Sequence, residues 1–471
     1  MSVTIGFAER VAGTVIEDIP EEALHEAERA FLDCLGVTAA AVYEPVAVKI
    51  RNYVVHQGGE PRASVIGHTR RTSPSLAALA NGCTAHVLDL DDTTPTICGH
   101  PSAVLVPAIL AVAEDIGASG ADALVAYILG FEVASRLARI LNPEHYNRGW
   151  HSTGTLLGIG AAAATSRMLK LSTERTAMAL GIAASLVSGL RQNFGTMTKS
   201  LHAGRAAENG VVAALLAADC WSADPKALEG PAGFLHLFNG RADPSVGWTV
   251  PGKDGWEIVT AGIGYKRFPS CGMTHPGIEA MLELRAKYDL RLEDVVGVVA
   301  TVTSAVPRVL IHLNPQTGLE GKFSLNYCIA VALAEGAVEQ SYFTEEGFAA
   351  AQEAKALMQN IQMIVDPALT IPTDFPASCP TILSVRLKDG RVLTHRTDRP
   401  LGQPGRPIPD GMLYNKFRAC VAPVYSQDSA ERLLERLVDL RNAPDVRRLM
   451  FFLRRQTRPR EKVYGSSSVE K

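Results

Sequence analysis

Apolar residues in the first half of the chain recur at the three- and four-residue spacing that is typical of helices. In one such segment Leu24, Ala27 and Phe31 follow this spacing, and Pro20 lies near the first turn. Several further segments repeat this plan behind a residue that can cap a helix. These helices are predicted to begin after Ser73, Ser119 and Ser172. Up to about residue 240 the sequence therefore predicts helix after helix.

Alanine and glycine lie on every side of these predicted helices, as in GTLLGIGAAAAT (154–165). Small residues on several faces let helix backbones approach one another closely, whereas a surface helix would show one continuous polar face. The composition of the helices therefore favours a multilayer helical core.

The pattern changes near residue 266, where segments of alternating and β-branched residues begin. The stretches 293–306 and 381–397 have the character of strands, and Asp389-Gly390 inside the second favours a hairpin. Amphipathic helices are expected between these strands, for example over 345–364. This region is predicted to be an α+β domain.

Helices return after the Pro- and Gly-rich stretch 399–411, for example at 429–440. At 471 residues the chain is too long for one ordinary core, so two domains are expected. We predict a mainly α protein with a second α+β domain. Its parts are a discontinuous all-helical domain (1–265), an α+β lid domain that interrupts it (266–403), and C-terminal helices that return to it (404–471).

Composition limits the class of protein. Hydrophobic residues make up 47% and charged residues 20% of the sequence, which is the balance of a globular protein. The N-terminal segment carries Glu9, Glu17 and Asp18, which is atypical of a signal or transit peptide. The longest apolar run (103–113) is about half as long as a helix that spans a bilayer. We therefore expect a cytoplasmic protein without a membrane partner.

Charge, cysteines and glycine motifs exclude further classes. The formal net charge is −3, and the basic stretch 445–462 is interpreted as the face of a C-terminal helix, so nucleic acid is not expected as a partner. The eight cysteines are scattered without a C-x-x-C pair, which argues against a disulfide framework or a zinc module. Neither a dinucleotide-binding motif nor a P-loop occurs, so a nucleotide cofactor is not indicated.

The stretch HVLDLDDTTPTICGHPS (86–102) contains three aspartates and two histidines. His86 and Asp89 stand three residues apart and could help to ligate magnesium, manganese or iron. A second interpretation is a structural, acidic helix end. A third is acid/base chemistry without a metal, in which nearby cations set the ionisation of a carboxylate. We favour the third, because the spacing lacks a complete metal-ligand pattern, and expect Asp91 and Asp92 only to shape the loop.

Three further polar islands interrupt the apolar helices, at 145–155, 189–210 and 264–277. They contribute the cationic candidates His151 and Lys199, and the candidate substrate contacts Arg191, His202 and Lys266. Cations that gather in clefts of a slightly acidic protein suit a small anion with carboxylates or phosphates. Each island taken alone is also compatible with ordinary core or surface side chains.

Together the four islands and one further motif resemble a known family. The motifs that carry the likeness occur in the order DLDDT…GHPS, GWHSTGT, FGTMTKSLHAGRAAENG, ALEGPAGFLHLF and YKRFPSCGMTHPGIEA. In their order and in the intervals between them, these motifs resemble those of the MmgE/PrpD family, and the likeness covers roughly residues 5–455. The resemblance implies an all-helical domain broken by an α+β lid, a homodimer, and chemistry that needs neither a metal nor an organic cofactor.

Members of that family dehydrate 2-methylcitrate, decarboxylate cis-aconitate or epimerise iminodisuccinate. The resemblance therefore implies a cofactor-independent lyase that acts on a small di- or tricarboxylate through a carbanion beside a carboxylate. An epimerase or other isomerase of a dicarboxylate is the alternative. A non-catalytic helical binding protein with the same fold is a more remote one.

The family's active-site pattern is carried over to particular residues of this chain. They are Asp89, Thr93, His100, His151 and Lys199, with Tyr327 as the candidate for a lid tyrosine. We expect Lys199 and His100 to bind carboxylates and Thr93 to supply a hydrogen-bonding contact. His151 is the leading candidate for proton transfer, because an imidazole near its ordinary pKa works in both directions at neutral pH. Asp89 either orients a histidine or acts as the partner base.

Overall fold

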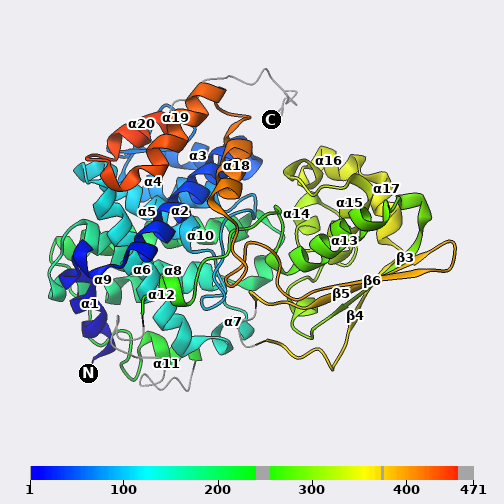
Figure 1. Cartoon of the computed structure of the whole chain (residues 1–471). Coiled ribbons are helices and arrows are strands. Elements are labelled where there is room, and N and C mark those ends of the chain that lie inside the picture. The colour runs from blue at the N-terminus through cyan, green and yellow to red at the C-terminus, as the bar shows by residue number, and fades with distance from the viewer. Residues whose placement is uncertain (1, 240–254, 373–375, 455–471) are drawn as a thin grey trace, which may run out of the picture.

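The computed structural model describes residues 2–239, 255–372 and 376–454. It confirms a mainly helical protein with a second, α+β domain, which we call the lid (Figure 1). The helical domain lies on one side of the molecule, and the sheet of the lid lies at the other.

The helical domain is built from the N-terminal part of the chain. Its helices are α1 Val3–Gly13, α2 Glu21–Ala40, α3 Pro45–Gln57, α4 Pro74–Ala85, α5 Pro101–Ile116, α6 Gly120–Leu141, α7 Glu144–Asn147, α8 Ser152–Met168, α9 Thr173–Leu186, α10 Met197–Ala218, α11 Phe234–Asn239 and α12 Glu257–Thr260. Two short strands, β1 (Ala63–Ser64) and β2 (Arg71–Thr72), pair antiparallel beside them.

Each predicted serine lies at the N-cap position, directly before the first residue of its helix. The Ser119 and Ser172 side chains accept hydrogen bonds from the N–H groups of Asp122 and Arg175. Ser73 takes the N-cap position of α4 without a side-chain hydrogen bond to the helix. The predicted starts of α4, α6 and α9 are therefore confirmed, because a polar cap or a proline interrupts the preceding chain there.

Helix α5 lies inside the helical domain, where all residues of 101–114 are buried. Helix α8 packs against α5, α6 and α10, and glycines make these approaches possible. A Cβ on Gly160 of α8 would stand 2.6 Å from the Gly130 carbonyl oxygen of α6. A Cβ on Gly204 of α10 would stand 2.4 Å from the Leu79 carbonyl oxygen of α4. The expected multilayer core of closely packed helices is thus confirmed.

The lid contains a four-stranded sheet in the order β4-β3-β5-β6. The strands are β3 Val295–Val302, β4 Ile361–Val365, β5 Thr381–Leu387 and β6 Val392–Thr397, and the helices are α13 His275–Tyr288, α14 Gly318–Gly321, α15 Leu325–Glu335, α16 Glu345–Ala350 and α17 Gln352–Met358. Strands β3 and β4 are parallel, and the other pairs are antiparallel. Helix α13 packs on β5 and β6 and helix α15 packs against β4, so the helices cover one face of the sheet (Figure 1).

Two predictions for the lid have different outcomes. Strands β5 and β6 form the predicted hairpin, with Gly390 at φ 89° in its turn. The continuous helix predicted over 345–364 is wrong. Ala351, with ψ 55°, separates α16 from α17, and residues 361–365 form a strand beside β3. A strand partner for these apolar residues outweighs their helical spacing.

The C-terminal helices are α18 Asp410–Val421, α19 Gln427–Val438 and α20 Arg447–Arg454. Helices α18 and α19 pack against α2 and helix α20 packs against α5, so they return to the helical domain as predicted. Their buried residues share one hydrophobic core with the N-terminal helices, whereas the lid has its own. The domain boundaries at 265 and 403 stay predictions, and the basic segment beyond 454 lies outside the described residues.

All eight cysteines are free thiols in the structure. Within the described ranges, no single helix is both long and apolar enough to cross a membrane. Helices α2 and α3 reach that length and hydropathy only together, and they meet at an angle of 91°.

Candidate active site

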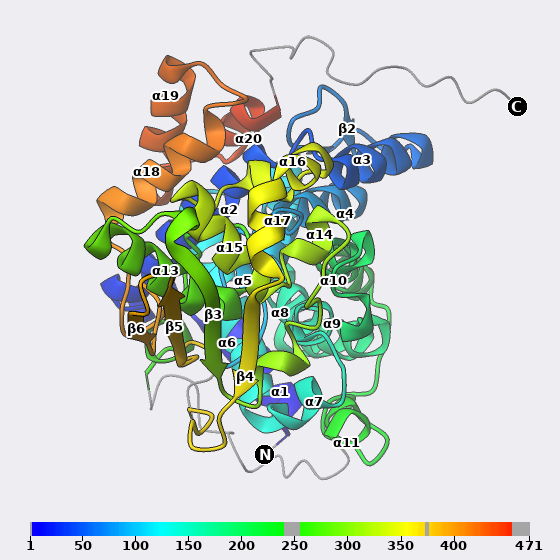
Figure 2. The ribbon, with the colours of Figure 1, turned by 90° about the vertical axis from the view of Figure 1, so that its right-hand side faces the viewer.

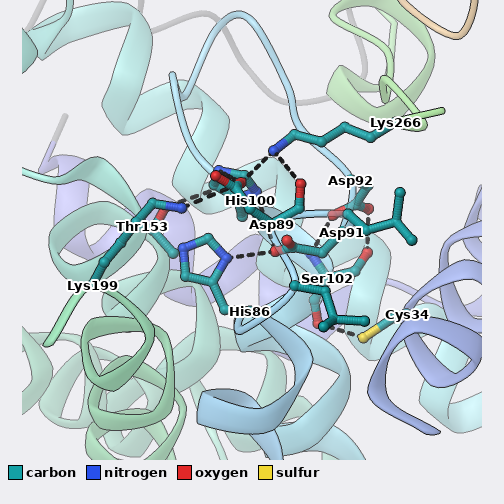
Figure 3. A network of polar contacts seen from close by, with 12 residues as sticks. Cys34, His86, Asp89, Asp91, Asp92, His100, Ser102, Thr153, Lys199 and Lys266 are labelled. Carbon is teal, nitrogen blue, oxygen red and sulfur yellow. Dashed lines mark hydrogen bonds and ion pairs between the residues drawn. The ribbon is translucent and has the colours of Figure 1, made fainter. Parts of the chain in front are cut away.

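A pocket between the helical domain and the lid brings together six of the nine predicted site residues. The six are Asp89, Thr93, His100, His151, Lys199 and Lys266. Tyr146 and Phe194 also belong to the helical wall of this pocket, whereas Met273, Val309 and Phe323 belong to the lid wall. Figure 3 shows the charged residues around the loop that joins α4 to α5.

The loop that joins α4 to α5 is held at its middle and at its C-terminal end by hydrogen bonds to other segments. The N–H of Thr93 donates to the Gly264 carbonyl oxygen (2.8 Å), and the N–H of Gly264 donates back to Thr93 (2.6 Å). The N–H of His100 donates to Thr153 Oγ1 at the start of α8 (3.2 Å). These contacts fix the loop between the chain entering the lid and α8, and they place Asp89, Thr93 and His100 in the wall of one pocket.

The carboxylate of Asp89 is the centre of the charge cluster. Its Oδ1 atom lies 3.3 Å from Lys199 Nζ and in direct contact with Lys266 Nζ. Burial acts to raise the pKa of Asp89, but Lys199 and Lys266 outweigh burial and hold that pKa well below its usual range. For Lys266, burial acts to lower the pKa, but Asp89 and Asp91 outweigh burial and raise it. Asp89 is therefore an ionised carboxylate between two lysines.

Asp91 lies behind His100 and contacts two imidazoles. His86 Nδ1 lies 2.7 Å from Asp91 Oδ2 in a hydrogen bond. His100 Nδ1 lies 3.1 Å from the same oxygen, which is a hydrogen-bond distance, but the two groups are imperfectly aligned. Burial lowers the pKa of His86 to about 4 and also lowers that of His100, so both rings are neutral at pH 7. A neutral ring with its Nδ1 proton toward Asp91 keeps a free electron pair on Nε2. The Nε2 atom of His100 lies 3.9 Å from Asp89 Oδ1.

His151 lines the pocket at the N-cap of α8, but its electrostatic surroundings differ from the expected ones. Its Nδ1 lies 3.0 Å from His202 Nδ1, so one of these two rings donates to the other. Burial, together with the nearby His86 and Lys199, holds the pKa of His151 well below its ordinary value. The prediction of an ordinary pKa is therefore wrong, and His151 is neutral at pH 7. His202 stands behind His151 and is not among the residues that line the pocket.

Asp92 points away from the pocket, toward the start of α5 (Figure 3). Its carboxyl group accepts hydrogen bonds from the Ser102 N–H (3.1 Å) and from the Ser102 hydroxyl, which also contacts the Tyr127 hydroxyl (2.7 Å). Burial raises the pKa of Asp92 well above its usual range. Asp92 is therefore a structural carboxyl group, as predicted, whereas its neighbour Asp91 contacts the imidazoles of His86 and His100.

The structure does not bring Arg191 or Tyr327 into the pocket. Arg191 donates to the carbonyl oxygens of Tyr146 (2.8 Å) and Arg308 (3.1 Å), and its guanidinium lies 4.0 Å from the centre of the Tyr146 ring. Tyr327 is buried in the core of the lid, where its hydroxyl donates to the Tyr342 carbonyl oxygen (2.7 Å). The expectation of Tyr327 at the site is corrected, because the tyrosine in the pocket lining is Tyr146 from the helical domain.

Sequence reasoning missed Asp91, His86 and Tyr146 as members or supports of the site. Asp91 carried a usable signal, since a carboxylate close to two histidines in sequence can bind an imidazole nitrogen. Tyr146 stands five residues before His151 in the same island, yet nothing in the spacing shows which way its ring points.

Of the described side chains, one group of three has ligand atoms close enough to share a metal ion. One atom each of His86, Asp91 and His100 lies within 4.8 Å of the other two. The Nδ1 atoms of both histidines already contact the Asp91 carboxylate, so an ion there would have to displace these contacts. The trio therefore fits the orientation of two imidazoles by one carboxylate without requiring a metal.

The pocket can bind a small anion. Lys199 and Lys266 both contact the carboxylate of Asp89, so two ammonium groups face one carboxylate in the wall of the pocket. Lys199 Nζ also lies 5.6 Å from the centre of the Phe194 ring and 5.3 Å from that of Phe323. A substrate carboxylate is the kind of group that such ammonium groups bind.

Comparison with known proteins identifies the family. Models of the MmgE/PrpD N-terminal domain and C-terminal domain match residues 6–246 and 268–440, so the chain belongs to the MmgE/PrpD family. It is 28% identical to cis-aconitate decarboxylase of Mus musculus, over 95% of this chain and 93% of that protein. It is 28% identical to cis-aconitate decarboxylase of Homo sapiens, over 97% and 96% of the two chains. The identity to cis-aconitate decarboxylase of Aspergillus terreus (strain NIH 2624) is 27%, over 96% of each chain.

Proposed function

We propose that the protein is a lyase that acts on a small di- or tricarboxylate, with decarboxylation of cis-aconitate as the leading reaction. The observation that carries this proposal is a pair of lysines, Lys199 and Lys266, that face the single buried carboxylate of Asp89. The similarity along nearly the whole chain to proteins named cis-aconitate decarboxylase supports this choice of reaction.

Lys199 is the proposed anchor for a substrate carboxylate. Its ammonium group has one ionic contact, with Asp89 at 3.3 Å, and otherwise lies beside aromatic rings. Lys266 donates to both the carbonyl and the carboxylate oxygens of Asp89, so it maintains the positive potential from a fixed position. Thr93 lies on the pocket wall, where its hydroxyl supplies a neutral hydrogen-bonding contact.

Decarboxylation breaks the bond between the carbon skeleton and one carboxylate, which departs as carbon dioxide. The electron pair stays on the skeleton, where in cis-aconitate it spreads over three carbons and an attached carboxylate. One of these carbons must then receive a proton. Fixed ammonium groups in a buried pocket stabilise the negative charge that develops during this step.

His100 is the proposed proton carrier, in place of His151. Its Nδ1 side faces Asp91, which leaves Nε2 on the side of Asp89 and the pocket. His100 alone is neutral at pH 7, but the carboxylates of a bound substrate raise its pKa, so that it takes up a proton from water and delivers it to carbon. The Nδ1 atom of His151 lies next to His202, whereas that of His100 faces a carboxylate. We therefore assign His151 the role of a neutral polar contact.

The test is incubation of the purified protein with cis-aconitate in deuterated water, followed by proton NMR and measurement of released carbon dioxide. We expect one carbon dioxide per molecule consumed, one deuteron in each product, and the same rate with a chelator. Citrate, 2-methylcitrate and iminodisuccinate are the comparison substrates. Loss of water or simple proton exchange with one of these would assign a dehydratase or an epimerase instead. Failure to change any of the four would contradict the enzyme proposal.

A further inference from the structure

We propose that Lys322 of the lid is a positioning residue for Asp89, and that it makes the geometry of the site depend on a seated lid. The functional part of this inference rests on the proposed function, in which Asp89 takes part. Lys322 follows α14, and its Nζ donates to the Leu88 carbonyl oxygen (2.5 Å) in the helical domain. It thus joins the lid to the residue directly before Asp89.

Three consecutive carbonyl oxygens around Asp89 each accept a hydrogen bond from a lysine. Lys322 Nζ donates to Leu88, Lys266 Nζ donates to Asp89 (2.9 Å), and Lys416 Nζ donates to Leu90 (2.9 Å). We call these three lysines the lysine bracket. Its members come from the lid, from the chain that enters the lid, and from helix α18, so three separate segments meet on one turn.

The backbone at Asp89 needs such support. Asp89 has φ 54°, a left-handed conformation that is unfavourable for a residue with a side chain by about 1 kcal/mol or more. The turn's own hydrogen bond, from the Asp89 N–H to the His86 carbonyl oxygen, is long at 3.4 Å. Hydrogen bonds to the carbonyl oxygens on either side therefore decide how the Asp89 peptide units are oriented, and with them the direction of the carboxylate.

Lys322 is an unusual choice if it only fills space. It is 2% exposed, and burial lowers its pKa. A buried ammonium group is harder to accommodate than an apolar side chain of the same size. Two of its three hydrogen bonds, to the Pro269 carbonyl oxygen and Gln340 Oε1 (each 2.8 Å), lie within the lid. Only the third reaches the helical domain, so this ammonium group is a lid-borne donor aimed at the Asp89 turn.

A displaced lid would remove the Lys322 bond from Leu88 while the Lys416 bond to Leu90 stays in place. The Asp89 turn would then lose one of its three supports, and its carboxylate would no longer be fixed between Lys199 and Lys266. Lid closure and the placement of the central carboxylate are therefore one event. A shift of about 1 Å in a group of the site is enough to slow a reaction by about 100-fold.

The test compares Lys322→Met with wild type in kinetics on cis-aconitate and in hydrogen–deuterium exchange. We expect kcat to fall about 10- to 100-fold with little change in KM, because Lys199 still binds the carboxylate. Amide exchange should rise in residues 86–100 and not in the core of the lid. Lys355→Met is the matched control, since the ammonium group of this lid lysine lies over the Phe348 ring of the lid (4.3 Å).

A second variant separates positioning from folding. In Lys322→Ala, added propylammonium should raise kcat and slow the exchange of residues 86–100, whereas propanol should do neither. Unchanged kcat and exchange in Lys322→Met would overturn the proposal, and so would faster exchange spread over the whole lid. If wild type turns over none of the carboxylates, the proposed function fails, and the exchange of residues 86–100 still decides the positioning role of Lys322.

Discussion

The two walls of the pocket differ in chemistry. The helical wall contributes an ionised carboxylate, imidazoles and a lysine, from Asp89, His100, His151 and Lys199. The lid wall contributes mostly apolar side chains, from Met273, Val309, Phe323 and Pro376. The elements of the lid lie in front of α5 and α8 when the molecule is viewed from the lid side (Figure 2).

This difference separates two tasks. A charged group has a larger effect on a developing negative charge when water is kept away, because the local dielectric is lower. The helical wall, together with Lys266 from the chain that enters the lid, holds the charges in fixed positions, and the apolar side chains of the lid wall exclude water from them. Substitutions on the helical wall should therefore change the rate strongly, whereas substitutions on the lid wall should change it weakly.

The largest effect is expected for Lys199→Met. Loss of the substrate-facing ammonium group should reduce kcat/KM for cis-aconitate by about 1,000-fold, because a fixed charge beside the developing carbanion is removed. Thermal unfolding should change little, since Lys266 still compensates the buried carboxylate of Asp89. Lys49→Met, on the exposed side of α3, is the control and should behave like wild type. A loss of kcat/KM below tenfold would contradict the assignment of the chemistry to the helical wall.

The next effect separates two neighbouring aspartates. Asp91→Asn should reduce kcat about 10- to 100-fold, because the amide that replaces the carboxylate no longer fixes the orientation of His86 and His100 or which ring nitrogen carries the proton. Asp92→Asn is the matched control. Its carboxyl has a raised pKa and contacts Ser102, so this change should alter stability and leave kcat almost unchanged. Equal losses of kcat in both variants would contradict the assignment of Asp91 to the site.

Acidification should weaken the fold through its buried histidines. Burial lowers the pKa of His86, His145 and His202 to about 4, and that of His275 to about 3. Because the unfolded chain binds protons to histidine below about pH 6.5 and the folded chain does not, the free energy of unfolding should fall as pH decreases from about 6.5 toward 4. Urea unfolding at several pH values measures this slope. A flat profile in that range would show that these rings are protonated in the folded protein.

A smaller effect is expected for Met273→Ala on the lid wall. It should lower kcat/KM by less than about tenfold, because it removes only apolar contact with the substrate. It should also reduce the free energy of unfolding by about 2–5 kcal/mol, since Met273 is buried. Kinetics and urea unfolding of the same preparation measure both quantities. A loss of activity as large as that of Lys199→Met would assign chemistry to the lid wall.

The smallest effect on rate is expected for Tyr327→Phe. The hydroxyl of Tyr327 donates to Tyr342 inside the lid, so its removal should lower stability by about 1 kcal/mol and leave kcat unchanged. Tyr146→Phe is the informative counterpart, because Tyr146 lines the pocket. A larger loss of kcat in Tyr327→Phe than in Tyr146→Phe would restore the lid tyrosine to the site.

Local patterns predicted the fold well where one local interaction, such as a helix cap or a turn, determined the structure. Serine caps and small residues at close helix contacts predicted the helical domain, and Asp389-Gly390 predicted the hairpin of β5 and β6. The helix predicted over 345–364 failed because its last residues pair with β3, a partner more than fifty residues away in sequence. Helical spacing in a short apolar segment cannot reveal such a partner.

The candidate site shows the same limit. The islands were found because they are polar in an apolar sequence, and the resemblance to the MmgE/PrpD family then selected Asp89, His100, His151 and Lys199 within them. The direction of a side chain depends on tertiary packing, so sequence could not tell Asp91 from Asp92, or Tyr146 from Tyr327. It also could not show that burial lowers the pKa of His151, since neighbours far away in the chain produce this effect.

The most direct test of the division between the walls is one side-by-side measurement of carbon dioxide release from cis-aconitate. Wild type, Lys199→Met and Met273→Ala would be compared at equal concentration with a chelator present. We expect release by wild type, a loss of about 1,000-fold in Lys199→Met, and a loss below about tenfold in Met273→Ala. The reverse order of the two variants, or release that stops when the chelator is added to wild type, would contradict a metal-independent reaction carried by the helical wall.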